Sequence, residues 1–82
     1  MEVKPSAVRD MQRLPRSIQK RVAQKIDSLA KDPFPRRSAK LEALGGLRRI
    51  RVGDYRIIYQ VRQEALVVLV VRIKHRGDAY RP

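Results

Sequence analysis

Residues 47–80 read LRRIRVGDYRIIYQVRQEALVVLVVRIKHRGDAY, and this stretch predicts three consecutive β-strands. Its first two runs, Leu47 to Val52 and Tyr55 to Arg62, are rich in β-branched and aromatic residues. Only Gly53-Asp54 separates them, a dipeptide that favours a two-residue hairpin turn. The third run, Leu66 to Lys74, shows no alternation before its last residues, which predicts a central strand buried on both faces.

The two-residue turn also fixes which residues face each other across the hairpin. It sets Arg51 opposite Arg56 and Arg49 opposite Ile58, all on one face of the sheet. Two guanidinium groups directly across a strand pair repel, at a cost of roughly 0.2–1 kcal/mol. A chain that keeps such a pair is expected to bind something anionic between them.

Two helices are predicted ahead of the hairpin. Residues 1–4 form a short edge strand that ends at Pro5, and Ser6 is the expected N-cap of a helix from Ala7 to about Leu14. A second helix spans Arg16 to Lys31 with apolar residues four, four and three apart, the spacing of a core-facing helix. Residues 34–46 are expected to form a loop.

This order, β-α-α-β-β-β, predicts a single α+β domain over residues 1–82. A mostly antiparallel sheet carries a helical hairpin on one face. In the second hairpin strand, Ile57, Tyr59 and Val61 are expected to face the helices. The open face is then the basic one, with Arg49, Arg51 and Arg56 on it.

The charge of the chain points to its class of partner. It has 20 Lys and Arg against 8 Asp and Glu, a net charge of +12. That excess favours nucleic acid first, then an acidic protein and then an anionic membrane surface, with a merely soluble basic surface as the plain alternative. Arginine outnumbers lysine, which favours phosphate contacts.

Composition also excludes several chemistries. There is no cysteine and only one histidine, so neither a thiolate site nor a multi-histidine metal site is available. The eight carboxylates are scattered, unlike those of a two-metal nuclease. The N-terminus lacks the apolar run of a signal peptide, and residues 65–71 are too short to span a bilayer. We therefore expect a cytoplasmic protein without metal, cofactor or membrane contact.

Several runs resemble one known family. The runs LRRIRVGDYRIIYQV and LVVLVVRIKHRGDAYR, in this order of elements, are similar to the RelE/ParE superfamily of toxin–antitoxin toxins, and within it to the RelE branch. The opening RDMQRLPRSIQKRV and the loop DPFP…LEALGGL fit as well, so the resemblance covers nearly the whole chain. Its most specific pieces are GDYRIIY and HRGDAY.

The resemblance implies a ribosome-dependent endoribonuclease that enters the ribosomal A site and cuts the exposed codon of the mRNA. The implied reaction needs no metal, because the 2′-hydroxyl attacks the adjacent phosphorus and leaves a cyclic phosphate. The implied partners are mRNA, the ribosome and a small acidic antitoxin. The toxin itself is expected to be a monomer within a hetero-oligomeric complex.

The resemblance also implies the site residues. The family's functional positions map onto Arg49, Arg51, Arg56, Arg76 and Tyr80, with His75 beside them. Arg51 and Arg56 suit a pair of clamps on the scissile phosphate, and Arg76 suits the leaving oxygen. Further RNA-backbone contacts are expected from Arg48, Arg49, Lys74, Lys20 and Lys25.

The general base remains open between two residues. Better-known RelE-like enzymes carry lysines on the first of these strands, whereas this chain has arginines, which are poor general bases. The task therefore passes to Tyr80 or His75. Alternatively, Tyr80 stacks on a base, orients the nucleophile or simply packs over the sheet edge.

Two other functions compete with the nuclease. A same-fold toxin of the ParE branch acts on DNA gyrase without cutting RNA. A catalytically weak RNA- or ribosome-binding module would keep salt-sensitive binding and show no cleavage. The basic strand positions together with Tyr80 favour the RelE reading.

Overall fold

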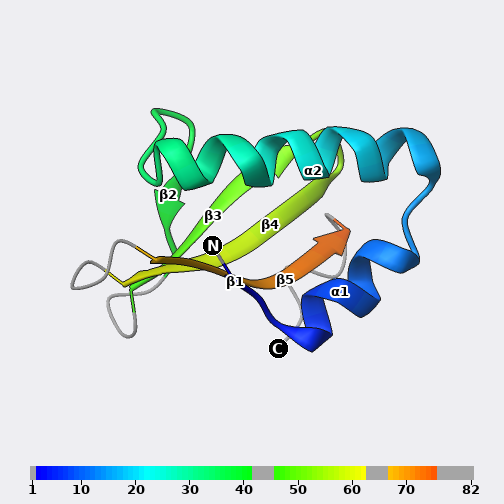
Figure 1. Ribbon diagram of the computed structural model, residues 1–82. Helices are drawn as coiled ribbons and strands as arrows, with labels where there is room; N and C mark the ends of the chain where they lie inside the picture. The colour runs from blue at the N-terminus through cyan, green and yellow to red at the C-terminus, as the bar shows by residue number, and fades with distance from the viewer. Residues whose placement is uncertain (1, 42–45, 63–66, 76–82) are drawn as a thin grey trace.

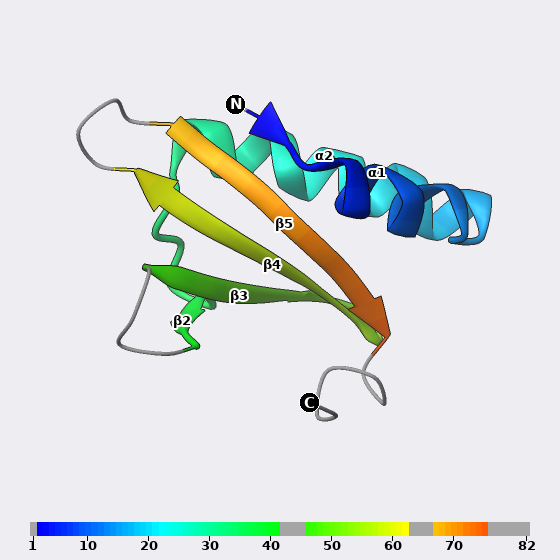
Figure 2. The same cartoon turned by 90° about the horizontal axis from the view of Figure 1, so that it is seen from below.

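In the computed structural model, which describes residues 2–41, 46–62 and 67–75, a five-stranded sheet carries two helices on one face (Figures 1 and 2). The elements are β1 (Glu2–Val3), α1 (Pro5–Gln12), α2 (Arg16–Lys31), β2 (Ala39–Lys40), β3 (Leu47–Val52), β4 (Tyr55–Arg62) and β5 (Val67–His75). The strand order is β1-β5-β4-β3-β2, with β1 parallel to β5 and the other pairs antiparallel. The predicted α+β fold with a mostly antiparallel sheet is confirmed.

The hairpin has the predicted register. Arg51 pairs with Arg56 and Arg49 pairs with Ile58 across β3 and β4. Gly53 begins the turn with φ of 59°, a left-handed conformation that glycine adopts without steric cost. The turn therefore sets both guanidinium groups on the same face of the sheet.

The core lies between α2 and the face of the sheet that α2 covers. Val22 and Leu29 of α2 are fully buried against Ile57 and Tyr59 of β4, as the four- and three-residue spacing predicts. The Tyr59 hydroxyl donates a hydrogen bond of 2.9 Å to the carbonyl of Pro33, so this buried tyrosine also holds the segment after α2. No helix of the described residues lies on the opposite face of the sheet (Figure 2).

The N-terminal segment closes the outer edge of β5. The Lys4 amide donates to the Val70 carbonyl at 2.9 Å, and the Ser6 hydroxyl donates to the Val71 carbonyl at 2.9 Å. The predicted N-cap role of Ser6 is wrong, because Pro5 takes a first-turn position and α1 begins one residue before Ser6. The Ser6 hydroxyl instead covers a backbone group that a sheet edge would leave exposed.

One strand was not predicted from the sequence. Ala39–Lys40 was expected to lie in a loop, yet it pairs with Arg48 and Arg49 of β3 as the short edge strand β2. Two residues are too few for a periodic pattern to show. Within the described residues, no helix is long and apolar enough to cross a membrane.

Candidate functional site

A row of three cations crosses the open face of the sheet. Arg51 of β3 pairs with Arg56 of β4, and Arg56 pairs with Lys74 of β5. Residues directly opposite on neighbouring antiparallel strands have Cβ atoms about 4.5–5.5 Å apart, so like charges here raise the free energy of the fold. Arg49 lies on the same face, two pairs further from the turn. The predicted strand cations are therefore brought together.

The three cations differ in exposure. Arg51 is exposed and Lys74 is half-buried, whereas Arg56 is only 5% exposed. The expectation that Arg56 projects into solvent from an open face is therefore wrong. A central strand is flanked on both sides, and its neighbours cover the side chain even where no helix does. Arg56 is the buried centre of the row, and Arg51 is its accessible end.

A hollow opens beside the row, at the hairpin turn. Its volume is about 180 Å³, and its walls are formed by Arg51, Gly53, Asp54, Tyr55 and Arg56. Sites for whole drug-sized ligands usually exceed about 300 Å³, so this hollow suits a single anionic group such as a phosphate. Two guanidinium groups at its wall match a phosphate, because the planar fork donates two parallel hydrogen bonds. The turn residue Asp54 adds a carboxylate that the sequence alone did not place here.

Arg72 of β5 is held by an ion pair with Asp10 of α1. Its Nε donates to Asp10 Oδ2 at 2.8 Å and its Nη2 to Oδ1 at 3.2 Å, while the Ile73 amide donates to Oδ2 at 2.9 Å. Burial alone would raise the pKa of the Asp10 carboxyl. The hydrogen bonds from Arg72 and Ile73, with the charges of Arg72 and Lys74, outweigh burial and lower that pKa below its usual 3.8.

Arg48 lies on the helix-facing side of β3, away from the cation row. Its Nη2 donates to the Ser38 hydroxyl at 2.8 Å, and its guanidinium sits 5.0 Å from the centre of the Phe34 ring. This geometry is a cation–π contact that holds the segment before β2. A side chain engaged in this way is poorly placed for the RNA contact expected of it.

His75 also lies away from the cation row. It pairs with Tyr55, and the two rings meet edge to face with centres 5.2 Å apart. Because side chains alternate along a strand, His75 and Lys74 point to opposite faces of the sheet. Arg76 and Tyr80, the other two residues expected here, lie outside the described residues.

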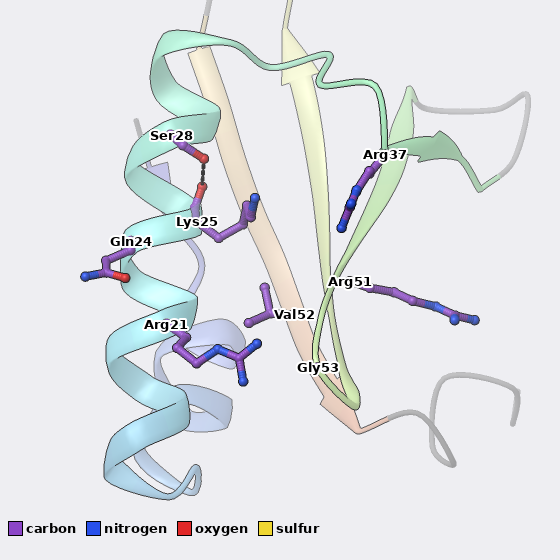
Figure 3. Close-up of a pocket in the computed structure, with 8 residues that line it drawn as sticks. All are labelled: Arg21, Gln24, Lys25, Ser28, Arg37, Arg51, Val52 and Gly53. Carbon is purple, nitrogen blue, oxygen red and sulfur yellow. Dashed lines mark hydrogen bonds between the residues drawn. The ribbon is translucent and has the colours of Figure 1, made fainter.

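A second basic hollow lies on the helix side of the hairpin (Figure 3). Its volume is about 390 Å³, and its lining is formed by Arg21, Gln24, Lys25, Ser28, Arg37, Arg51, Val52 and Gly53. It includes Lys25 among the expected RNA contacts, while Lys20 does not line it. Arg21 belongs to the basic outer face of the second helix, which the sequence left open between a solvated surface and a phosphate-contacting one, and Arg37 was not singled out. The pairing of Arg21 with Lys25 one helical turn apart was the available signal, whereas nothing local indicated Arg37.

The described part of the chain offers no metal site. Residues 2–41, 46–62 and 67–75 contain no group of three or more His, Asp or Glu side chains that could hold an ion. The chemistry available at the cation row is charge stabilisation by guanidinium and ammonium groups.

Comparison with known proteins identifies the family. The sequence profile of the ParE toxin of the type II toxin–antitoxin system parDE matches residues 1–80. Toxin RelG of Mycobacterium tuberculosis is 31% identical over 77 residues, which cover 93% of this chain and 88% of RelG. This fold and these sequence matches together define a toxin of a type II toxin–antitoxin system. The chain belongs to the RelE/ParE superfamily, in its RelE branch.

Solved structures agree with this assignment. A chain of the archaeal RelE–RelB complex of Pyrococcus horikoshii superposes with a TM-score of 0.82 at 34% identity, covering 93% of this chain and 92% of that one. A chain of the toxin–antitoxin complex RelBE2 of M. tuberculosis gives 0.79 at 30% identity, covering 92% and 94%. The fold and the family are thus fixed independently of the cation row.

Proposed function

We propose that this toxin is a ribosome-dependent endoribonuclease that cuts mRNA in the A site and so inhibits translation. The observation that carries the proposal is the row formed by Arg51, Arg56 and Lys74 on three adjacent strands. Such a row repels itself in the free protein, and a phosphate held between its members removes that repulsion.

The cation row suits attack of a 2′-hydroxyl on the neighbouring phosphorus. The oxygen–phosphorus bond that forms closes a 2′,3′-cyclic phosphate, and the bond that breaks releases the 5′-oxygen of the next nucleotide. Negative charge grows on the phosphoryl oxygens during this exchange. Arg51 and Arg56 stabilise that charge from fixed positions, which favours the transition state over the bound substrate.

The reaction removes a proton from the 2′-hydroxyl, which requires a general base. It adds a proton to the leaving 5′-oxygen, which requires a general acid. His75 follows Lys74 of the row directly but points to the opposite face of the sheet, with its ring against Tyr55. That contact favours Tyr80 over His75 as the group that accepts the 2′-hydroxyl proton. Arg76 is proposed to stabilise or protonate the 5′-oxygen as it leaves.

A small acidic antitoxin is proposed as the regulating partner. The related chains of P. horikoshii and M. tuberculosis were solved as toxin–antitoxin complexes. The net charge of +12 on this chain suits a partner of opposite charge, which would be drawn to it at long range.

Substitution of Arg51 tests the proposal most cleanly, because Arg51 is exposed and lies in the row. Arg51→Ala should lower cleavage at A-site codons about 10²–10³-fold, the usual loss when one group that stabilises transition-state charge is removed. The measurement adds purified toxin to a reconstituted translation reaction and maps new 5′ ends on the message.

Two controls accompany this measurement. Arg62→Ala removes the same charge from an exposed position at the far end of β4 and should cleave like the wild type. Message without ribosomes should stay intact. If wild-type toxin leaves ribosome-bound message intact, the nuclease proposal fails.

The ParE profile match favours one alternative, a toxin that acts on DNA gyrase. In that case the cation row is a binding surface only. A gyrase supercoiling assay separates the two, since a nuclease of this kind leaves supercoiling unchanged while a ParE-like toxin blocks it.

A further inference from the structure

The second basic hollow gathers cations from three separate parts of the chain. Figure 3 shows the Arg21 side chain reaching from α2 toward Gly53, and Lys25 and Arg37 pointing into the gap between α2 and β3. Arg51 points away from α2, toward the open face of the sheet. The Arg21 guanidinium comes within 3.5 Å of the position that a Cβ on Gly53 would take, so it rests directly on the hairpin turn.

These cations have no acidic partner among the described residues. The ion pair found there joins Arg72 to Asp10, neither of which lines the hollow. No hydrogen bond joins Arg21, Lys25 or Arg37 to a carboxylate in residues 2–41, 46–62 and 67–75. Converging like charges without counter-charges lower the stability of the free fold, and an anion placed among them reverses that effect.

The second hollow shares part of its lining with the hollow beside the cation row. Arg51 and Gly53 line both of them, one from each side of the hairpin turn. A single polyanion could therefore run from the cation row, around the turn and into the gap beside α2. Repeated negative charges along one flexible strand are a property of a nucleic-acid backbone.

We infer that the hollow between α2 and β3 is a second phosphodiester-binding site, which holds a stretch of RNA backbone other than the scissile phosphate. The inference rests on the proposed function, since it takes RNA to be the substrate. Arginine supplies three of the four cations, and its planar fork matches phosphate oxygens better than a lysine ammonium does. Arg51 joins the two sites, with one hollow on each side of it.

The test measures how binding to ribosomes depends on salt. The probe is a ribosome programmed with a message whose A-site codon carries 2′-O-methyl groups, which block the nucleophile and leave binding alone to be measured. The variant Arg21→Gln/Lys25→Gln is compared with Arg9→Gln/Arg13→Gln, which removes the same charge from exposed positions at the end of α1.

The hollow variant should flatten the plot of log affinity against log salt by about 1.4, since each lost contact to single-stranded nucleic acid removes about 0.7. If the two plots meet at about 1 M salt, this difference in slope makes the hollow variant bind roughly 25-fold more weakly than the wild type at ~0.1 M. The α1 variant should match the wild type. Arg37→Gln, a substitution outside any helix, should give about half the change in slope, and a cooperative thermal unfolding transition in each variant establishes that it folds.

A second arm locates the RNA. Loss of affinity for a short 2′-O-methyl oligonucleotide of the same codon assigns the hollow to the message strand. Loss on ribosomes alone assigns it to ribosomal RNA, and both results support the inference. Equal losses in the hollow and α1 variants would overturn it, because general charge would then account for binding. Unchanged ribosome binding with weakened antitoxin binding would also overturn it, in favour of an acidic protein.

This design separates the two proposals. A changed slope without cleavage by the wild type would retain the RNA site and remove the nuclease. Normal cleavage with an unchanged slope would retain the nuclease and remove the second site.

Discussion

Asp10 fastens α1 to the edge of β5 and is the residue with the clearest electrostatic role in the described chain. Its carboxylate accepts hydrogen bonds from the Arg72 guanidinium and from the Ile73 amide, and its side chain is only 11% exposed. Hydrogen bonds to a charged group contribute about 1.5–3 kcal/mol each, more than neutral ones. The contact also gives the Arg72 guanidinium a carboxylate partner.

Replacing Asp10 should therefore destabilise the fold in a way that depends on pH. Asp10→Asn should lower the free energy of unfolding by about 1–3 kcal/mol at pH 7, as measured by urea denaturation. The pKa of Asp10 is lowered in the folded state, so its contribution is present above the unfolded pKa of about 3.8. It is lost as the pH falls through the lower folded value, and the difference between wild type and variant should close there.

Asp27→Asn is the matched control, because Asp27 is exposed on α2 and takes part in no ion pair within the described residues. It should have little effect at either pH. A difference between wild type and Asp10→Asn that persists unchanged at pH 3 would show that the carboxylate charge is not what stabilises this edge.

Arg56 shows how far sequence reasoning reaches for a single residue. Strand alternation and the turn correctly placed it on the same face as Arg51. They could not give its exposure, because exposure depends on which strands flank it and what lies over them. The same limit applies to Arg48, whose contacts with Ser38 and Phe34 depend on how the segment after α2 returns to the sheet.

At the scale of elements, long periodic segments were predictable and short ones were not. The bounds of α2 agree with the prediction, since sixteen residues with regular apolar spacing leave little ambiguity. The hairpin of β3 and β4 agrees as well, because Gly53 specifies the turn. By contrast, β2 forms only because β3 offers it a partner, and α1 begins at Pro5 while the Ser6 hydroxyl, expected to cap it, bonds to the Val71 carbonyl instead.

The hairpin turn gives a test at this scale. Gly53→Ala should lower the free energy of unfolding by about 1–2 kcal/mol, because φ of 59° brings a Cβ too close to its own backbone. Crowding from outside adds little, since the nearest atom to that Cβ is Arg21 Nη1 at 3.5 Å, an ordinary contact distance. Urea denaturation of the variant measures the loss.

Gly53→Asn separates conformational strain from side-chain size. Asparagine is larger than alanine but adopts left-handed conformations more readily, so it should destabilise the fold less than alanine does. Equal losses for both substitutions would mean that the side chain, not the backbone conformation, is what the turn rejects.

At the scale of the whole molecule, charge repulsion opposes the fold. The chain carries a net charge of +12, and the cation row and the second basic hollow concentrate part of it around β3. A large net charge keeps a protein soluble but destabilises its compact state. An anionic partner, whether RNA or antitoxin, is then expected to stabilise the fold in addition to binding it.

Salt should therefore stabilise the free toxin. Raising NaCl from ~0.01 to ~0.1 M shortens the Debye length from about 30 to 10 Å, which screens repulsion between distant cations while leaving buried contacts nearly unchanged. We expect the thermal midpoint to rise by several degrees, since ~1 kcal/mol corresponds to about 4–8 °C in a domain of this size. Chloride is the appropriate anion, because sulfate or phosphate would occupy the basic hollows directly.

A midpoint that stays constant or falls would mean that local ion pairs such as Asp10–Arg72 outweigh the net repulsion. The Arg9→Gln/Arg13→Gln variant decides between these, because with two fewer positive charges its midpoint should start higher in low salt and rise less.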